Sequence, residues 1–311
     1  MPRLSVLLPV KDGGRFLRQA IDSVLRSLPS DGELVVLNDG SSDNTADILD
    51  GYVSNRLTVH TAPSPMGISA GLNHLITHTD SEIIARMDAD DVSLPWRFGR
   101  QMRLLRSSDI VFSSIAYMTT RGFIRRPDIP GPIGNEAMAL HLLIASFVCH
   151  PTMMARRDAL PDVPYRRVAA EDYDLWLRLI AGGKRLARDS MPSYLYREHS
   201  SQISMSEGWL KWRDRSDTSL PVLQSYQAAL DEFAIGVTAS RNILEFVQGG
   251  GHDLEKSDVD GLRSILGSVK ERSRRLSVPE RVTLGLRIRR VEGRLARQQA
   301  EIGCGGSSWG S

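Results

Sequence analysis

Short apolar runs alternate with amphipathic segments over the first third of the chain. Residues 4–10 form a continuous apolar run, as expected of a strand buried in a parallel sheet, and further strands are expected at 33–37, 57–61, 82–87 and 110–117. The segments between them predict helices. They are residues 16–25, a helix that begins after Ser42 or Asp43 and runs through Leu49, residues 69–77 and residues 95–106. This alternation predicts an α/β fold with a doubly wound, mostly parallel sheet and flanking helices.

The later pattern is less regular. Residues 119–134, with three prolines, predict an irregular connection. We then expect a helix at 136–147, a strand-like segment at 150–156, a helix from Glu171 to the Gly182-Gly183 pair, and two short strands at 184–188 and 194–196.

After residue 206 the alternation typical of strands is lost, and helical spacing prevails to about residue 300 with a break at 249–251. We therefore expect an α/β domain over residues 1–204 and a helical extension over 205–302. The closing residues 303–311 are small and polar, which predicts a disordered tail.

Acidic residues follow several of the predicted strands. Ligands of such sheets bind beyond the carboxyl ends of the strands, where Asp12, Asp39, Asp88 and Asp90 all fall. Strand alternation places Asp88 and Asp90 on the same face. Two carboxylates that lie close together on one face repel each other unless a cation or hydrogen-bond donors lie between them. Carboxylate oxygens suit Mg²⁺ or Mn²⁺.

An alternative interpretation needs no metal. The segment could be a polar loop in which an aspartate caps a helix opened by Leu94-Pro95, since aspartate is a preferred cap and proline is tolerated at the first helical position. Beside a metal site, too, we expect Asp91 to be a helix cap. Asp39 could likewise be only a turn residue before Gly40.

Composition adds limits. The chain has 311 residues, of which 41% are hydrophobic and 24% charged, with a mean hydropathy of -0.21, as in soluble globular proteins. No apolar run is long enough to span a bilayer, and the N-terminus lacks the pattern of a signal peptide. Two cysteines cannot form a disulfide framework. We expect a cytoplasmic protein.

Charge is distributed unevenly. The net charge is +2, yet residues 270–297 carry ten basic and three acidic side chains, a net charge of +7. Apolar residues interleave with the arginines there, as in helices that lie on the anionic inner face of a membrane. A solvated helix packed on the protein is the alternative. Nucleic-acid binding is not expected, because no recognised binding motif accompanies the charge.

Five segments of the chain carry a family resemblance by their residues and their order. They are residues 4–11, Asn38-Asp39-Gly40-Ser41-Ser42-Asp43, residues 67–73, Met87-Asp88-Ala89-Asp90-Asp91 and Glu171-Asp172. Together they resemble family 2 glycosyltransferases, which are inverting enzymes with the GT-A fold. The resemblance covers about two thirds of the chain and implies transfer of a sugar from a nucleotide diphosphate donor, expected to be a UDP-sugar. The implied acceptor is a hydroxyl of a saccharide or a lipid-linked saccharide.

The same resemblance implies roles for individual residues. Those matching the donor site are Pro9, Val10, Asp39, Gly67, Asn73 and Asp88. Asp90 matches the carboxylate that holds a divalent ion, Mn²⁺ or Mg²⁺, and His199 lies where the family can supply a further ligand. The segments Pro65-Met66-Gly67 and Gly71-Leu72-Asn73 depart from the family's usual Asn-x-Gly and Ala-Arg-Asn, which removes an expected basic contact to phosphate.

Asp172, the second acid of the Glu-Asp pair, matches the general base that removes the proton of the acceptor hydroxyl. Its place at a predicted helix N-terminus favours the ionised form and weakens it as a base, whereas burial or the nearby Glu171 and Asp174 would act in the opposite direction. The alternative is an acidic first turn that only complements the helix dipole.

Two rival functions remain at this point. A sugar-nucleotide nucleotidyltransferase would need a basic, glycine-rich loop after the first strand, which Lys11-Asp12-Gly13-Gly14-Arg15 only partly provides. A non-catalytic scaffold that binds nucleotide-sugars would not need Asp172.

Overall fold

The computed structural model of the chain describes residues 3–127, 131–199, 216–250 and 254–305. These residues fall into two compact units. The first comprises Met1–Pro132, Val148–Arg167 and Lys184–Trp212, and the second Ile133–Phe147, Val168–Gly183 and Arg213–Ser311. The domain boundary predicted between residues 204 and 205 lies outside the described residues and stays a prediction.

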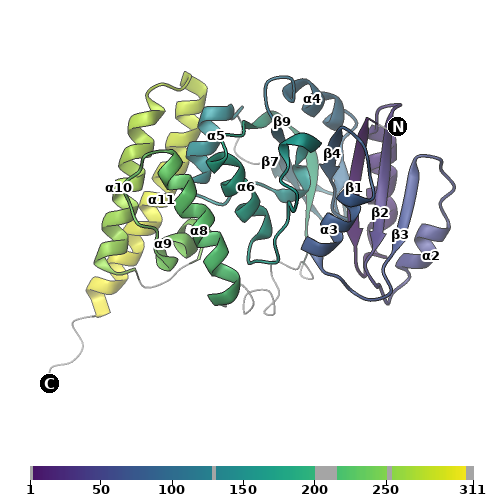
Figure 1. Cartoon of the computed structure of the whole chain (residues 1–311), viewed down its shortest axis with the longest axis horizontal. Coiled ribbons are helices and arrows are strands. Elements are labelled where there is room, and N and C mark those ends of the chain that lie inside the picture. The colour runs from purple at the N-terminus through teal and green to yellow at the C-terminus, as the bar shows by residue number, and fades with distance from the viewer. Residues whose placement is uncertain (1–2, 128–130, 200–215, 251–253, 306–311) are drawn as a thin grey trace. The chain divides into compact units, whose positions relative to one another are not determined.

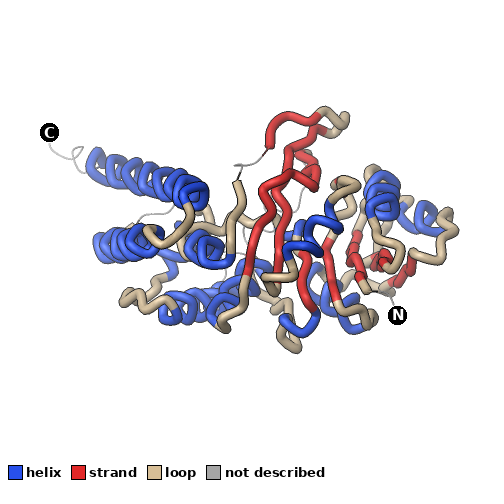
Figure 2. Tube along the Cα trace, turned by 90° about the horizontal axis from the view of Figure 1, so that it is seen from above, coloured by secondary structure: helices blue, strands red, loops and turns tan. Residues whose placement is uncertain are grey.

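The first unit is built on a sheet of nine described strands in the order β3-β2-β1-β4-β8-β6-β9-β5, with β7 paired to β6 (Figure 1; strands are red in Figure 2). The strands are β1 Leu4–Val10, β2 Gly32–Asn38, β3 Leu57–Thr61, β4 Ile83–Arg86, β5 Val92–Ser93, β6 Ile110–Thr119, β7 Ile124–Pro127, β8 Met154–Arg156 and β9 Leu186–Glu198. Its α-helices are α1 Leu17–Ser27, α2 Thr45–Asp50, α3 Ile68–Thr77 and α4 Arg97–Leu104.

The first four apolar runs form the parallel part of the sheet, as predicted. β1 pairs in parallel with β2 and β4, and β2 with β3. All of β1 except Pro9 is buried, because helices cover the centre of the sheet, whereas β3 at the edge is largely exposed. The fold class is the expected α/β architecture with flanking helices.

The second half of the sheet is mixed. β8 pairs antiparallel with both β4 and β6, while β6 and β9 run parallel. The two short strands expected at 184–188 and 194–196 are one strand, β9, whose register against β6 shifts between Phe112 and Ile115. The segment expected to be strand-like at 150–156 is a 3₁₀ turn, His150–Thr152, followed by β8.

The second unit is helical. Its helices are α5 Asn135–Leu142, α6 Glu171–Ala181, α8 Ser216–Glu232, α9 Arg241–Val247, α10 Lys256–Ser273 and α11 Val278–Gly305. α11 extends into the segment expected to be a disordered tail, and residues 306–311 lie outside the described residues. None of the described helices is both long and apolar enough to cross a membrane.

Asp258 joins α9 to α10 in this unit. Its buried carboxylate accepts hydrogen bonds from Ser240 Oγ (2.5 Å), Asn242 Nδ2 (2.8 Å) and the Glu255 amide (3.1 Å). Burial acts to raise the pKa of Asp258, but these three donors outweigh it and lower the pKa below the usual aspartate value.

We predict that Asp258→Ala lowers the free energy of unfolding by about 1–2 kcal/mol at neutral pH, because three donors lose a charged acceptor. Since the folded-state pKa is depressed, the ionised carboxylate stabilises the fold above the unfolded-state value near 3.8. The contribution is lost as pH falls through the folded-state pKa. Denaturant titrations of both proteins from pH 7 downward should therefore converge in acid; a constant difference would contradict this account.

Candidate active site

Three carboxylates gather at the carboxyl end of β4. The strand is buried throughout and delivers Asp88, Asp90 and Asp91, each of which places one carboxylate oxygen within 4.8 Å of an oxygen of the other two. The side chains of Asp88 and Asp90 are 28% and 32% exposed, whereas Asp91 is buried. Two carboxylates are thus open to a ligand and the third is enclosed.

Asp91 is held by β9. Tyr194 Oη donates to its Oδ2 at 2.7 Å and the Arg197 amide donates to its Oδ1 at 2.7 Å. α4 begins only at Arg97, so the expectation that Asp91 caps a helix opened by Leu94-Pro95 is wrong. Burial, followed by repulsion from Asp90 and Asp88, raises the pKa of Asp91 well above its usual value.

The register of β5 against β9 explains this placement. Val92 lies opposite Leu195 and Ser93 opposite Tyr194, in antiparallel pairing. Continued backwards by two residues, the same register sets Arg197 opposite Asp90, whose carbonyl accepts from Arg197 Nε at 2.6 Å. A strand of only two residues therefore aligns β9 with the carboxylates.

Arg86 neutralises Asp88 from within β4. Its Nη2 lies 2.8 Å from Asp88 Oδ1, and the Asp88 amide donates to Tyr194 Oη at 3.3 Å. Burial raises the pKa of Asp88; Arg86 opposes this, and the neighbouring Asp90 adds to it. Because the protein by itself disfavours the ionised Asp88 carboxylate, a cation bound beside it would stabilise that form.

His199 reaches the same cluster from the end of β9. Its Nε2 lies 2.7 Å from Asp90 Oδ2, and its ring lies 5.6 Å from the ring of Phe16. The two residues predicted to hold a metal, Asp90 and His199, are thus in direct contact although they are 109 positions apart.

Arg97 underlies the cluster as a fully buried cation on α4. Its Nη2 donates to the carbonyls of Arg86 (2.7 Å) and Pro151 (2.8 Å), and its guanidinium stacks on the ring of Tyr194 at 4.9 Å. Burial lowers the pKa of Arg97 to about 10, so it remains charged at neutral pH. Arg97 thereby fixes the β4 backbone just before the carboxylates.

The carboxylate set fits a divalent cation of the oxygen-loving kind. Asp88 and Asp90 are partly exposed, close together and acidic, as Mg²⁺ and Mn²⁺ sites require. Asp91 fits less well, because both of its oxygens already accept hydrogen bonds from β9. Asp88 and Asp90 are therefore the carboxylates that could hold an ion.

The loops after β1 and β2 are tied to each other beside this end of the sheet. Asp12, at a left-handed φ of 53°, accepts from the Ser42 amide at 2.7 Å, and Asp43 accepts from the Gly14 amide at 2.8 Å. The hydrogen bond from the Ser42 amide lowers the pKa of Asp12. These bonds fix the shape of the two loops.

Asp39 supports the loop that precedes α3. Its buried carboxylate accepts from the amides of Met66 (2.6 Å) and Gly67 (2.9 Å), and Gly67 takes a positive φ of 83°. Each oxygen keeps a second lone pair that a donor hydroxyl or base could use.

Two further donor-site candidates lie at the end of β1, where Pro9 pairs with Leu37 and Val10 with Asn38. A Cβ added at Gly71 would stand 3.0 Å from Leu37 Cδ2 and 3.9 Å from Pro9 Cβ. α3 therefore approaches the strand ends closely because this residue is glycine.

Asn73 makes a structural contact. Its Nδ2 donates to the Tyr165 carbonyl at 2.7 Å, and its Oδ1 accepts from the Tyr165 amide at 3.1 Å. Both ends of the amide are thus used within the protein. The Tyr165 hydroxyl in turn lies 3.0 Å from His150 Nε2.

Asp172 belongs to the second unit, in the first turn of α6. Ala170, two residues before it, takes a left-handed conformation with φ 52°, and the Asp172 Oδ1 accepts from the Tyr173 amide at 2.8 Å. Its neighbour Asp174 is fully buried and binds Arg178 Nε (2.9 Å) and Ser225 Oγ (2.7 Å). Asp172 is partly exposed.

Comparison with known proteins decides the family. The sequence profile described as "Glycosyl transferase family 2" matches residues 5–163, half of the chain. The chain belongs to this family. It is 31% identical to the Escherichia coli "O-antigen biosynthesis glycosyltransferase WbnJ" over 65% of the chain and 82% of that protein.

A second Escherichia coli glycosyltransferase, "UDP-Glc:alpha-D-GlcNAc-diphosphoundecaprenol beta-1,3-glucosyltransferase WfaP", is 21% identical over 67% of the chain and 82% of that protein. Among solved structures, Staphylococcus aureus TarS in complex with UDP-GlcNAc superposes with a TM-score of 0.60 at 14% identity, covering 99% of this chain and 93% of that one. The mannosyltransferase PcManGT from Pyrobaculum calidifontis, in complex with GDP-Man and Mn²⁺, gives 0.50 at 15%, covering 96% and 86%. These structures share the fold of this glycosyltransferase.

The sequence did not reveal Arg86, Arg97, Tyr194 and Arg197. Arg86 lies within the strand motif, where alternation could have placed it beside Asp88. Tyr194 and Arg197 depend on pairing between distant segments, and nothing in the local pattern marks them or Arg97.

Proposed function

We propose that this glycosyltransferase moves a sugar from a UDP-sugar to a hydroxyl of a saccharide or lipid-linked saccharide, with inversion at the anomeric carbon and with Mn²⁺ or Mg²⁺. The observation that carries the proposal is the carboxylate cluster at the end of β4 in a family 2 glycosyltransferase. The relatives add support, because one is named for a UDP-glucose donor and a diphosphoundecaprenol-linked acceptor, and a solved neighbour holds UDP-GlcNAc.

The donor site would be formed by the ends of β1, β2 and β4. Pro9, Val10 and Gly67 would line the nucleoside pocket, and Asp39 would accept hydrogen bonds from the base or ribose. Asn73 would contribute indirectly by holding the Tyr165 segment against α3.

Asp90 and His199 would hold the divalent ion, with Asp88 binding the ribose or an ion-bound water. When bound, such an ion supplies Lewis-acid neutralisation of the diphosphate. Arg86, Tyr194 and Arg197 would keep the carboxylates oriented by the contacts already described.

Asp172 would act as the general base. As the acceptor oxygen bonds to the anomeric carbon, the bond to the nucleoside diphosphate breaks and the hydroxyl proton passes to the Asp172 carboxylate. The helix N-terminus favours an ionised carboxylate, the form that can accept a proton.

We predict that UDP binds more tightly with Mn²⁺ than without it, and that Asp90→Ala removes most of this gain. The affinity in Mn²⁺ should fall by about 100-fold or more, because metal–phosphate contacts contribute several kcal/mol. Isothermal titration calorimetry measures the UDP affinity of wild type and variant with and without Mn²⁺. Asp50→Ala, on the exposed end of α2, is the matched control. A UDP affinity that changes neither with Mn²⁺ nor with Asp90→Ala would refute the metal role.

For Asp172→Asn we expect UDP affinity to be retained and turnover to fall by about 10²–10⁴-fold, because the amide cannot take the proton. Turnover is measured as UDP release from UDP-glucose or UDP-GlcNAc with saccharide-diphosphate-lipid acceptors. Asp162→Asn, an exposed acid outside the site, is the control. Full turnover by Asp172→Asn would favour a scaffold or a different base.

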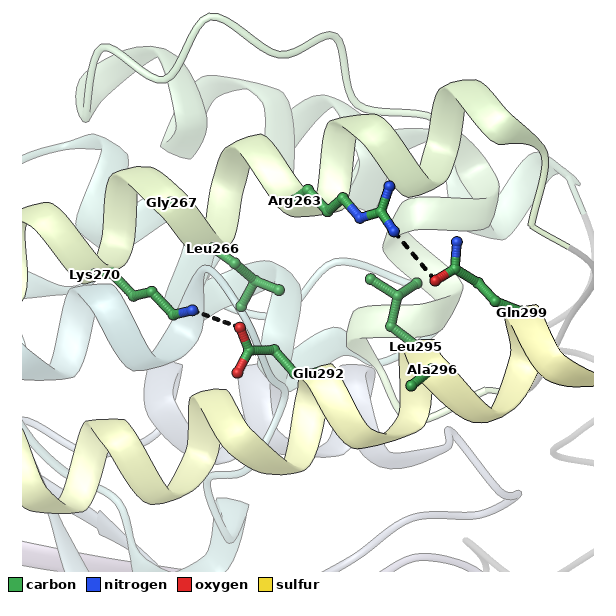
Figure 3. Close-up of a pocket in the computed structure, with 8 residues that line it drawn as sticks. All are labelled: Arg263, Leu266, Gly267, Lys270, Glu292, Leu295, Ala296 and Gln299. Carbon is green, nitrogen blue, oxygen red and sulfur yellow. Dashed lines mark hydrogen bonds and ion pairs between the residues drawn. The ribbon is translucent and has the colours of Figure 1, made fainter.

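The basic segment 270–297 divides into two faces. Leu284, Ile288, Val291 and Leu295 of α11 are buried within the second unit, and α11 is joined to α10 by Lys270–Glu292 (2.5 Å) and Arg263–Gln299 (3.3 Å), as Figure 3 shows. Arg287 and Arg294 also face inward: Arg287 Nε donates to His141 and Arg294 Nη2 to the Phe246 carbonyl. One face of α11 is thus packed on the protein, as in the alternative to a membrane-bound helix.

The opposite face of α11 fits an anionic membrane surface. Val278, Val282 and Leu286 follow one another at four-residue spacing and are 63%, 56% and 40% exposed. The exposed arginines that accompany them are Arg274, Arg275, Arg281, Arg289 and Arg290. We propose that this face makes peripheral contact with anionic lipid, where a lipid-linked acceptor would be available.

We predict that the protein cosediments with phosphatidylglycerol-containing vesicles and that Arg289→Glu/Arg290→Glu lowers the affinity by about 10-fold or more, at roughly 1 kcal/mol per basic residue. The double variant Lys256→Glu/Arg263→Glu makes the same charge change on α10 and should bind nearly as well as the wild type. Equal losses in both variants would indicate a general charge effect and not this face.

A further inference from the structure

The turn between β6 and β7 exposes two large apolar side chains to solvent. Phe123 is 68% exposed and Ile124 is 61% exposed, and every residue from 121 to 127 is exposed. In the described sheet β7 is paired only with β6. We call residues 119–127 the hairpin tip.

Hydrogen bonds give the turn a defined shape. The Thr119 amide donates to the Phe123 carbonyl at 3.0 Å, and the Gly122 amide donates to the Thr119 carbonyl at 2.9 Å. The Phe123 amide donates to Thr119 Oγ1 at 3.2 Å. Gly122 takes a positive φ of 86°, which glycine adopts without strain. An ordered turn thus holds Phe123 and Ile124 in solvent.

The apolar pair is flanked by positive charge. The hairpin tip carries Arg121, Arg125 and Arg126, all of them exposed, and no acidic residue. Arg125 Nη1 lies 3.6 Å from Glu198 Oε2, and the Arg126 guanidinium lies 4.4 Å from the centre of the Tyr117 ring. Among the described residues no carboxylate forms an ion pair with Arg121 or Arg126. The tip therefore keeps a net positive charge.

This combination is complementary to an anionic bilayer surface. The boundary between headgroups and acyl chains accepts aromatic and aliphatic side chains, and arginine can extend its charged end to the lipid phosphates while its stem stays in apolar surroundings. We infer that the hairpin tip inserts shallowly into an anionic phospholipid surface. Phe123 and Ile124 would lie at the headgroup boundary and the three arginines at the phosphates.

The tip begins beside the carboxylate cluster of the same unit. In the register of β6 against β9, Thr119 lies opposite Glu198, and Arg197 Nη1 donates to the Thr119 carbonyl at 3.3 Å. The next residue, His199, contacts Asp90 at 2.7 Å. An inserted tip would therefore hold the carboxylates near the lipid surface. That this brings them to a lipid-linked acceptor rests on the proposed function, whereas the insertion itself does not.

The contact is tested with Phe123→Trp, whose indole reports the polarity around position 123. On vesicles of phosphatidylcholine with phosphatidylglycerol, the emission added over wild type should shift to the blue and be quenched by brominated acyl chains, because indole settles at the headgroup boundary. Val53→Trp is the control, because Val53 is 101% exposed on the first unit, and its added emission should not change. Phosphatidylcholine alone should produce little of either effect.

Cosedimentation measures the apolar contribution. Phe123→Ser/Ile124→Ser should lower the affinity for the phosphatidylglycerol-containing vesicles by about 10-fold or more, since the apolar area that enters the lipid is lost. Val53→Ser should bind as the wild type does. The thermal unfolding midpoints of both variants should match that of the wild type, because the altered side chains are largely exposed.

Charge reversal measures the electrostatic contribution. Arg121→Glu/Arg126→Glu should also lower the affinity by about 10-fold or more. Arg103→Glu/Arg106→Glu makes the same charge change at other exposed positions of the first unit and should bind nearly as well as the wild type. Equal losses in both double variants would indicate a general charge effect and overturn the assignment to the tip.

Three further outcomes would overturn the inference: no binding to the vesicles, equal binding to phosphatidylcholine alone, or vesicle-bound Phe123→Trp whose emission stays that of the protein in solution. The last result would mean that another surface, such as the exposed face of α11, makes the contact. No sugar donor enters these measurements, so their failure is distinct from a failure of the proposed transfer reaction.

Discussion

The repulsion among Asp88, Asp90 and Asp91 is the constraint on which the first unit depends. Three carboxylates that each place an oxygen within 4.8 Å of the others at a buried strand end are unfavourable unless the surroundings compensate their charge. Much of the described structure around β4 supplies that compensation: Arg86 within the strand, Arg97 beneath it on α4, and Tyr194 and Arg197 across from it on β9. The compensation is asymmetric. Asp91 is satisfied by the protein, while Asp88 and Asp90 retain exposed oxygens, which is the division expected of a site that is built to receive a cation.

The local pattern of the sequence predicted much of the fold. β1 to β4 were predicted because each is a short, mostly apolar or β-branched segment, and a parallel sheet follows from the helices between them. β9 was divided in two because Asp189 and Pro192 interrupt its apolar pattern; in the structure the strand continues through a shift in register against β6. β5 has only two residues and carries no pattern that could be recognised. Strand pairing between distant segments is the information that a single sequence withholds.

The same distinction holds in the candidate site. Asp39, Asp88 and Asp90 were identified because they lie in motifs that resemble a family, and His199 because the family can supply a ligand at its place in the chain; the structure brings Asp90 and His199 into contact. Asp91 was assigned to a helix cap because aspartate often caps helices, and this was wrong because its partners come from residues more than 100 positions away. Asn73 was expected at the donor, and the structure shows its amide bound to the Tyr165 backbone by one donated and one accepted hydrogen bond; its donor role stays a prediction. The roles of Asp39, Asp90, His199 and Asp172 in binding and catalysis remain proposals.

The long separations in the sequence have a consequence for synthesis. Asp91 and Tyr194 are 103 positions apart, Asp90 and His199 109, and Gln19 and Arg197 178. While the chain is being made, β1 to β4 can pair early, but the acidic end of β4 has no partners from β9 until residue 199 has left the ribosome. Closing such long loops is entropically costly, so the site would be completed late in folding. A ribosome-bound fragment that ends before β9 would hold three mutually repelling acids, and stalling there would leave an acidic and incompletely paired sheet exposed to chaperones and proteases.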